Sequence, residues 1–285
     1  MITVVRAGPL TTVQDLGRPG YAHLGVPRSG ALDQPALRRA NALAGNPPDA
    51  AVLETTLMGC VLRFSEAGRV GVAGATATIK VDGQVVDAAK GIEVPAGGVL
   101  EIGRATGGVR SYVAIRGGLD VPPVLGSRST DTLSGLGPPR LTDGMTLPVG
   151  TPRAKPAEGE PRGAVPPDSS ATRGKSELVL DVVLGPRDDW FRTGELFATA
   201  YTVSPVSNRV GTRLAGTALT RNKAGELPSE GVVLGSVQVP ADGQPLIFLA
   251  DHPTTGGYPV IGVVDDVTPL AQARPGTTVR FRALD

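Results

Sequence analysis

The sequence predicts an all-β fold with minor helices, and three observations lead to this prediction. The 285-residue chain contains 39 glycines and 26 prolines, well above the roughly 12% that these residues usually contribute together. They separate short runs rich in Val, Ile and Thr, a pattern typical of many strands joined by tight turns. An Asp-Gly pair within 81–84 lies between two alternating segments and predicts a two-residue hairpin.

The expected strands follow one another along both halves of the chain. Each is a short run of β-branched residues that ends at glycine, proline or aspartate. In order, they fall within 69–74, 77–86, 91–103, 109–118, 176–185, 230–240, 244–251 and 277–284.

Three short helices are expected between these strands. The first covers 33–44, where Asp33 caps the start, Pro35 suits the first turn and Gly45 ends the helix. A second is expected within 186–197. A third begins at Thr268, with proline in its first turn.

A stretch rich in Pro, Gly, Ser and charge covers 151–175. It shows no apolar periodicity and cannot form a core of its own. We interpret it as a linker or mobile loop between two β-barrel-like lobes, residues 1–150 and 176–285.

The overall composition excludes several classes of protein. With 28 basic and 27 acidic residues, the chain has no electrostatic footprint for nucleic acid or an anionic membrane. Its single cysteine, Cys60, excludes an intramolecular disulfide and favours a reducing compartment. No apolar run reaches the length of a membrane span. A cytoplasmic protein is expected.

Common catalytic motifs are missing from the sequence. It contains no Walker-type phosphate loop, no dinucleotide-binding fingerprint and no nucleophile elbow. Its two histidines, His23 and His252, are far apart, and Cys60 has no CxxC partner, so no metal site is expected.

Polar residues are concentrated in the loops of the last third of the chain. Loops held by a rigid sheet are where binding and catalytic residues gather. The polar residues here are Ser207, Asn208, Arg209, Arg213, Glu226, Ser229, Glu230, Gln238, Asp251, Thr254, Thr255 and Tyr258.

A second polar region covers 12–46. Here Arg18 or Arg28 is a candidate clamp for a carboxylate or phosphate, because the planar guanidinium suits both groups. The alternative is that Asp15 and Arg18 pair with one another at the surface. In the same way, Asn208 and Thr255 could serve turns, and Glu230 could pair with Arg209.

Three stretches carry a family resemblance. These stretches resemble the KipA-type carboxyltransferase-domain proteins. They are the pattern VQDxGRxGxxxxGVxxSGAxDxxAxxxAN at 13–41, AVLETTLMG at 51–59 and RSYVAIRGGLDVPPVLGSRSTDT at 110–132. These proteins are also called allophanate hydrolase subunit 2 or the C subunit of 5-oxoprolinase. The polar runs of the last third match as well, so the resemblance covers nearly the whole chain except 151–175.

The resemblance implies two cyclophilin-like β-barrels and an enzyme made of several subunits. The expected partners are a KipI-like subunit (the B subunit of 5-oxoprolinase) and a LamB/YcsF-type subunit (the A subunit), which together open 5-oxoproline to glutamate. ATP, with Mg²⁺, would be bound by or shared with a partner. Two alternatives remain: the carboxyltransferase part of a biotin-dependent urea carboxylase, and a non-enzymatic regulator that binds a KipI-like kinase inhibitor.

Activation of an amide or lactam requires general bases and preorganised donors. The candidate bases are Glu226, Glu230 and Asp251. We expect Arg209→Ala and Glu230→Gln to lower activity at least tenfold, with little change in the melting temperature. The candidate substrate-binding residues are Asp15, Arg18, Arg128, Ser207, Asn208, Arg209, Arg213, Gln238, Thr254, Thr255, Gly256, Gly257 and Tyr258.

The chain departs from the family pattern at one motif. Relatives often read ADRQTTGGYPKI where this chain reads ADHPTTGGYPVI, so His252, Pro253 and Val260 replace Arg, Gln and Lys. The lysine is a charge that could bind phosphate or polarise a carbonyl, and this chain lacks it.

Overall fold

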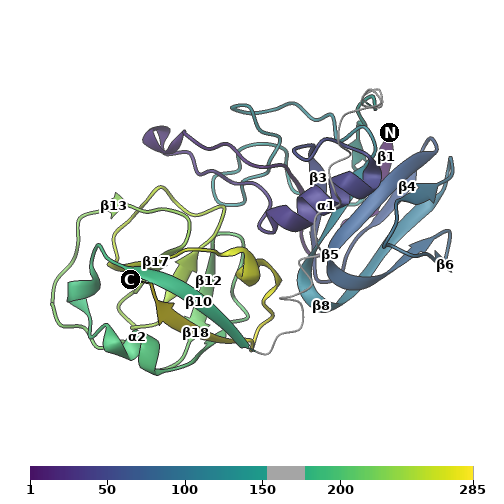
Figure 1. The fold of residues 1–285 in the computed structure, drawn as a ribbon. Coiled ribbons are helices and arrows are strands. Elements are labelled where there is room, and N and C mark those ends of the chain that lie inside the picture. The colour runs from purple at the N-terminus through teal and green to yellow at the C-terminus, as the bar shows by residue number, and fades with distance from the viewer. Residues whose placement is uncertain (153–176, 285) are drawn as a thin grey trace, which may run out of the picture.

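The computed structural model describes residues 1–152 and 177–284. The described chain has two β lobes (Figure 1). The N-terminal lobe is one sheet of β1–β9, and the C-terminal lobe is a barrel of β10–β12, β14, β15, β17 and β18. Most of the predicted linker lies outside the described residues, and the boundary stays a prediction.

The N-terminal lobe is built on a nine-stranded antiparallel sheet. Its main path runs β2-β3-β8-β4-β1-β9, while β5 pairs with β6, β7 and β8. The predicted hairpin is confirmed: Asp82 and Gly83 connect β5 to β6 with φ angles of 49° and 80°. The strands are β1 (Ile2–Arg6), β2 (Thr11–Gln14), β3 (Val52–Thr56), β4 (Val61–Phe64), β5 (Gly68–Val81), β6 (Gln84–Val85), β7 (Ile92–Val94), β8 (Val99–Ile115) and β9 (Thr146–Leu147).

The first predicted helix is confirmed as α1 (Gln34–Ala44). The carboxylate of Asp33 accepts a hydrogen bond of 2.9 Å from the backbone N–H of Ala36, and Gly45 ends the helix with φ 79°. The helix lies directly on β5, where a Cβ at Gly71 would come within 2.0 Å of the Ala40 carbonyl. Glycine at that position therefore permits the close helix–sheet contact.

The C-terminal lobe is a closed barrel in the order β10-β17-β14-β15-β12-β11-β18. Closure leaves no unpaired strand edge, and the interior is filled by apolar side chains. The barrel strands are β10 (Glu177–Leu184), β11 (Tyr201–Val203), β12 (Gly211–Ala215), β14 (Ser236–Gln238), β15 (Leu246–Phe248), β17 (Val260–Val264) and β18 (Thr278–Ala283), and β13 (Glu230–Gly231) pairs separately with β16 (Thr255–Gly256).

The other two predicted helices are shorter than expected. The first is divided into η3 (Asp188–Trp190) and α2 (Gly194–Ala198), because Phe191 is extended and bridges to Arg221. The segment at Thr268 is the 3₁₀ helix η4 (Thr268–Gln272), and η1 (Ala22–Leu24) is a further short turn. The all-β class with minor helices is confirmed. Among the described residues, no helix has the length and apolarity needed to cross a bilayer.

Gln272 of η4 joins the C-terminal lobe to β8 of the other lobe. Its Oε1 accepts hydrogen bonds from the backbone N–H groups of Val109 (2.9 Å) and Arg110 (3.0 Å). Its Nε2 donates to the Asp33 carboxylate and to the Arg110 carbonyl. Leu32, next to Asp33, packs within the core of the C-terminal lobe. These contacts fix one lobe against the other.

Candidate functional site

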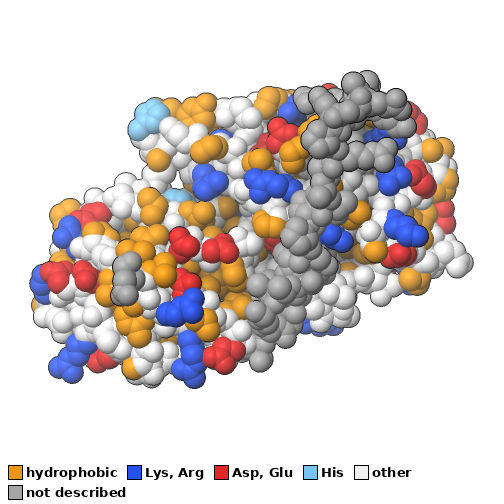
Figure 2. Space-filling view, in the orientation of Figure 1, with side chains coloured by type: hydrophobic (Ala, Val, Ile, Leu, Met, Phe, Trp, Pro, Cys, Tyr) orange, Lys and Arg blue, Asp and Glu red, His pale blue; other side chains and the backbone are white. Residues whose placement is uncertain are grey.

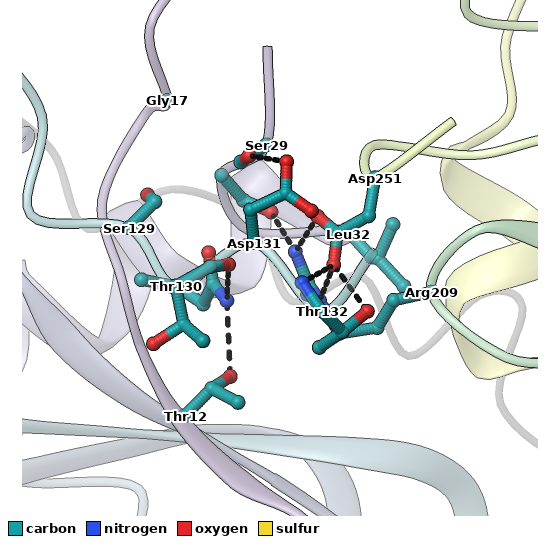
Figure 3. Close-up of polar contacts among 12 residues, drawn as sticks. Thr12, Gly17, Ser29, Leu32, Ser129, Thr130, Asp131, Thr132, Arg209 and Asp251 are labelled. Atoms are coloured by element: carbon teal, nitrogen blue, oxygen red, sulfur yellow. Dashed lines mark hydrogen bonds and ion pairs between the residues drawn. The ribbon is translucent and has the colours of Figure 1, made fainter. Parts of the chain in front are cut away.

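Arg209 and Asp251 form a buried ion pair at the junction of the lobes. Nε and Nη2 of Arg209 donate to Oδ2 and Oδ1 of Asp251, each at 2.9 Å. The two side chains are 1% and 0% exposed. Two parallel charge-assisted hydrogen bonds hold both groups in one orientation, as Figure 3 shows.

Glu54 of β3 adds a carboxylate from the N-terminal lobe. Arg209 donates from Nη1 to Glu54 Oε1 at 2.5 Å and from Nη2 to the Gly30 carbonyl at 2.7 Å. Burial alone would lower the pKa of Arg209, but the charges and hydrogen bonds of Glu54 and Asp251 outweigh it and raise that pKa. The sequence predicts that Arg209 contacts substrate. The structure places it inside the protein, with its donors directed at protein oxygens, which favours a positioning role.

The same carboxylate joins Tyr112 and Arg110 of β8 to the network. Tyr112 donates its hydroxyl hydrogen to Glu54 Oε2 at 2.8 Å, and Arg110 Nε lies 3.5 Å from Glu54 Oε1. Burial, followed by the charges of Glu54 and Asp33, raises the pKa of Tyr112 well above its usual value, and burial lowers the pKa of Arg110. Arg110 and Arg209 therefore share the Glu54 carboxylate, and Arg209 also binds Asp251 of the other lobe.

Asp251 also holds a loop of the N-terminal lobe. Its Oδ2 accepts from the backbone N–H and the hydroxyl of Thr132, at 2.9 and 2.7 Å. The neighbouring Asp131 accepts from Ser29 Oγ at 3.1 Å and from the backbone N–H groups of Leu133 and Ser134. Figure 3 shows Asp131 and Asp251 beside one another at the lobe junction.

The Asp15 carboxylate is hydrogen-bonded within the N-terminal lobe. Its carboxylate accepts from the hydroxyls of Ser127 and Ser129 and from the backbone N–H of Arg128, each at 2.6 Å, and from Gly17 N at 2.8 Å. These four donors nearly fill its acceptor capacity. The surface pair with Arg18, considered from the sequence, is not the arrangement found.

Arg18 is 1% exposed. Nε donates to the Val124 carbonyl at 3.2 Å, Nη1 to Ser29 Oγ at 3.0 Å, and Nη2 to the Ser129 carbonyl. Burial lowers the pKa of Arg18, and the charges of Asp15, Asp131 and Asp251 oppose that shift. The guanidinium is enclosed by its own loops, so direct contact between Arg18 and a substrate is not supported.

Arg28 is more exposed to solvent than Arg18. Arg28 is partly buried, and its guanidinium makes no hydrogen bond or ion pair within the described part of the chain. Ser29, its neighbour, donates its backbone N–H to the Ala250 carbonyl at 3.0 Å. This bond brings Arg28 close to the loop that carries His252.

His252 is 6% exposed. Its Nδ1 lies 2.6 Å from the Pro253 carbonyl. Burial lowers the pKa of His252, the charge of Arg28 lowers it further, and the Pro253 carbonyl, Asp251 and Asp131 act in the opposite direction. The ring is therefore neutral at pH 7.

Figure 2 shows the molecule hollowed between the projecting loop of η1, purple in Figure 1, and the C-terminal lobe.

The remaining predicted residues do not gather around Arg209. Glu230 pairs with Arg187, Nε to Oε2 at 3.0 Å, and this hydrogen bonding lowers the pKa of Glu230. Gln238 donates to the Tyr258 carbonyl, and Glu226 is exposed on a loop. The pairing of β13 with β16 places Glu230 beside Thr254, Thr255, Gly256 and Gly257.

Ser207 and Asn208 support a turn before β12. Asn208 Oδ1 accepts from the backbone N–H of Val210 and Gly211, and Ser207 Oγ accepts from the backbone N–H of Arg213. The turn-forming role considered for Asn208 is thus the one the structure shows. The Glu230–Arg209 pair considered from the sequence is not found, since each residue has another partner.

The predicted residues also divide between two cavities. One, of about 220 Å³, is lined by Asp15 and Arg128 together with Asp49 and Asp120. The other, of about 330 Å³, is lined by Arg213 among other residues. Neither cavity is lined by Arg209, Glu230 or Asp251.

Sequence reasoning missed Glu54, Tyr112 and Asp131. A glutamate within the apolar run VLETT was the available signal, because a charged residue in a buried strand requires a partner.

Val260, where relatives often have lysine, packs in an apolar cluster with Val232, Leu246 and Phe248. Among residues 1–152 and 177–284, no three His, Cys, Asp or Glu side chains are grouped to hold a metal ion.

Comparison with known proteins gives similarity along the whole chain. The C subunit of 5-oxoprolinase from Escherichia coli is 37% identical over 293 residues, which cover 99% of this chain and 90% of that protein. The C subunit of 5-oxoprolinase from Haemophilus influenzae is 33% identical over 100% of this chain and 91% of its own length. A urea amidolyase of Saccharomyces cerevisiae is 33% identical, but the match covers 16% of that protein.

Solved structures agree with these similarities. The urea carboxylase of Kluyveromyces lactis superposes with a TM-score of 0.89 at 31% identity, over 100% of this chain. The K. lactis urea amidolyase gives 0.88 at 30% identity. This chain spans only 27% and 19% of those two chains.

The profile of the family described as carboxyltransferase domain, subdomain A and B, matches residues 24–283. The resemblance seen in the sequence motifs is confirmed by this match and by relatives that are at least 33% identical over nearly the full chain. The chain therefore belongs to the carboxyltransferase domain A and B family.

Proposed function

We propose that this chain is the C subunit of an ATP-dependent 5-oxoprolinase, active within a complex of several subunits that opens 5-oxoproline to glutamate. One observation carries the proposal. The two bacterial relatives, each named as the C subunit of 5-oxoprolinase, match this chain along 90% and 91% of their own lengths.

The chemistry requires activation of a stable lactam. Transfer of the γ-phosphoryl group of ATP to the amide oxygen makes the ring carbon electrophilic. Water then adds to that carbon, the C–N bond breaks with a proton passing to nitrogen, and a second water releases phosphate from the acyl phosphate. This chain would contribute binding, orientation and proton positions at the lobe junction.

The three predicted bases are not equivalent. Asp251 is buried and accepts hydrogen bonds from Arg209 and Thr132, so it is suited to positioning. The pKa of Glu230 is lowered by Arg187, which makes Glu230 a weak base at neutral pH. Glu226 is exposed on a loop. His252 is neutral and close to Arg28, and it is a better candidate for proton transfer than any of them.

The remaining components belong to partners in this proposal. We assign ATP and Mg²⁺ to a site bound by or shared with the KipI-like B subunit or the LamB/YcsF-type A subunit. This chain then supplies the part of the site at its lobe junction, and the partners supply the phosphoryl donor.

A second candidate function is carboxyl transfer in a urea carboxylase, in which biotin would carry the carboxyl group. The close superposition on the K. lactis urea carboxylase, with a TM-score of 0.89, favours it. The 5-oxoprolinase proposal is preferred because its relatives match over nearly their whole length, whereas the match to the yeast urea amidolyase covers 16% of that protein.

Co-expression with the B-type and A-type subunits tests the proposal. The purified complex is assayed for glutamate formation from 5-oxoproline with and without ATP, and for carboxyl transfer from carboxybiotin to urea. Glutamate formation that requires both ATP and this chain supports the proposal. Carboxyl transfer to urea alone favours the second candidate, and a complex inactive in both assays favours a KipA-like regulator.

A further inference from the structure

Two polar groups at the lobe junction have no hydrogen-bond partner among the described residues. The first is the Arg28 guanidinium. Its backbone is held firmly: the Arg28 carbonyl accepts from Arg18 N at 2.7 Å, and Ser29 N donates to the Ala250 carbonyl at 3.0 Å. A Cβ at Gly17 would come within 2.5 Å of that same Arg28 carbonyl. The chain thus fixes the position of Arg28 and leaves its charged group unpaired in the described residues.

The second group is Nε2 of His252. A carbonyl oxygen can only accept, so the 2.6 Å contact with Pro253 places the hydrogen of the neutral ring on Nδ1. Nε2 then carries a lone pair, and no group in the described part of the chain donates to it. The ring is only 6% exposed and lies near Phe248, with 5.9 Å between ring centroids. Nε2 itself is not fully buried, so a ligand can reach its lone pair.

The nearby carboxylates do not neutralise Arg28. Asp251 accepts hydrogen bonds from Arg209 and Thr132, and Asp131 accepts from Ser29 and two backbone N–H groups. Their orientations are fixed by these bonds. A cationic donor and a neutral acceptor therefore remain unpaired among the described residues, on two segments that the hydrogen bond from Ser29 N to the Ala250 carbonyl joins.

We propose that Arg28 and His252 form the recognition site for a small substrate in which a carboxylate lies next to a ring N–H. Arg28 binds the carboxylate, and His252 Nε2 accepts the hydrogen bond from the N–H. The inference rests on the proposed function, because 5-oxoproline carries its carboxylate on the carbon next to its lactam nitrogen.

The pairing also selects against related molecules. Guanidinium and carboxylate match in shape and charge, and a substrate without a carboxylate leaves Arg28 unpaired. A molecule whose nitrogen carries a methyl group instead of hydrogen leaves Nε2 without a donor. A site built to hydrogen-bond a group discriminates strongly against analogues that lack it.

The test measures binding rather than turnover, by titration calorimetry on the chain co-purified with its partner subunits. The probes are 5-oxoproline, 2-pyrrolidinone (no carboxylate) and N-methyl-5-oxoproline (no N–H). The variants are Arg28→Ala, His252→Phe and His252→Gln, where Gln restores an acceptor. Arg104→Ala is the matched control for Arg28→Ala, since Arg104 is exposed and lies in β8, away from this loop.

Arg28→Ala is expected to weaken 5-oxoproline binding at least tenfold and to leave 2-pyrrolidinone binding unchanged. His252→Phe is expected to weaken 5-oxoproline binding at least fivefold without affecting N-methyl-5-oxoproline, and His252→Gln to recover part of the loss. Wild-type affinity in both the Arg28 and His252 variants, or equal losses for all three probes, overturns the inference.

The failures of the two proposals are distinguishable. If the complex forms glutamate from 5-oxoproline while the variants bind it normally, the site assignment fails and the proposed function stands. If the wild-type complex binds allophanate in an Arg28-dependent manner but does not bind 5-oxoproline, the anion site stands and the proposed function fails. If the wild-type complex binds none of the probes, both the recognition site and the proposed function are contradicted.

Discussion

Arg209 and Asp251 bind one another through two parallel hydrogen bonds of 2.9 Å while both are excluded from solvent. The pair reaches beyond its own lobe, since Arg209 also contacts Glu54 and Asp251 holds Thr132. The loops that surround the candidate site are therefore set by a buried charge network rather than by local turns alone.

Arg209→Ala is expected to destabilise the protein by about 3–5 kcal/mol, because it leaves buried carboxylates without their cation. This revises the expectation from sequence, in which Arg209 was a loop residue whose loss would hardly change the melting temperature. Chemical denaturation measures the effect. Arg213→Ala, at an exposed site, should stay within about 0.5 kcal/mol of wild type. Equal stability of the two variants would contradict the network.

Asp15→Asn is expected to lower the free energy of unfolding by about 2 kcal/mol or more, because the amide replaces an oxygen acceptor with a donor facing other donors. Ser127, Ser129 and Arg128 would each lose or weaken a hydrogen bond. Urea denaturation checks this. Asp49→Asn is the control, since Asp49 is exposed in the same cavity. A loss no larger than that of the control would argue against the structural role of Asp15.

Gln272→Leu is expected to weaken the contact between the lobes. The leucine has similar bulk but satisfies neither the backbone N–H groups of Val109 and Arg110 nor the Asp33 carboxylate. Buried unsatisfied groups cost about 1–3 kcal/mol each. Hydrogen exchange should speed up at Val109 and Arg110 before it does in the barrel strands. Unchanged protection of those two amides would count against this contact.

His252 predicts a specific dependence of stability on pH. Its pKa in the folded protein lies below the ordinary value of about 6.5, because burial and then Arg28 disfavour the charged ring. The unfolded chain therefore takes up the proton more readily, and stability is lost as the pH falls below about 6.5. His252→Phe should show a smaller loss between pH 7.5 and 5.5 in denaturation experiments. Parallel curves for the two proteins would rule out this contribution.

Local features were predictable from sequence, and long-range pairings were not. The Asp33 cap and the Asp82–Gly83 hairpin depend on neighbours within a few residues, and both form as expected. The partner of Arg209, by contrast, lies 155 residues away in β3. Nothing in the spacing of charges tells which carboxylate closes that distance.

The candidate site could not be located from sequence for the same reason. A sequence shows that Arg18 and Arg28 are both suited to bind an anion, but only the fold distinguishes them. Arg18 is enclosed by carbonyls and Ser29, whereas Arg28 keeps an open guanidinium. His252 was noted from the sequence as a departure from the family motif. Its neutral state depends on burial and on Arg28, which come together only in three dimensions.

The most direct test is glutamate formation from 5-oxoproline by the co-purified complex, measured with ATP and with this chain present or omitted. We expect glutamate to accumulate only when ATP and this chain are both present, and Arg28→Ala to lower the rate at subsaturating 5-oxoproline at least tenfold. Equal glutamate formation with and without this chain would contradict its assignment to a 5-oxoprolinase.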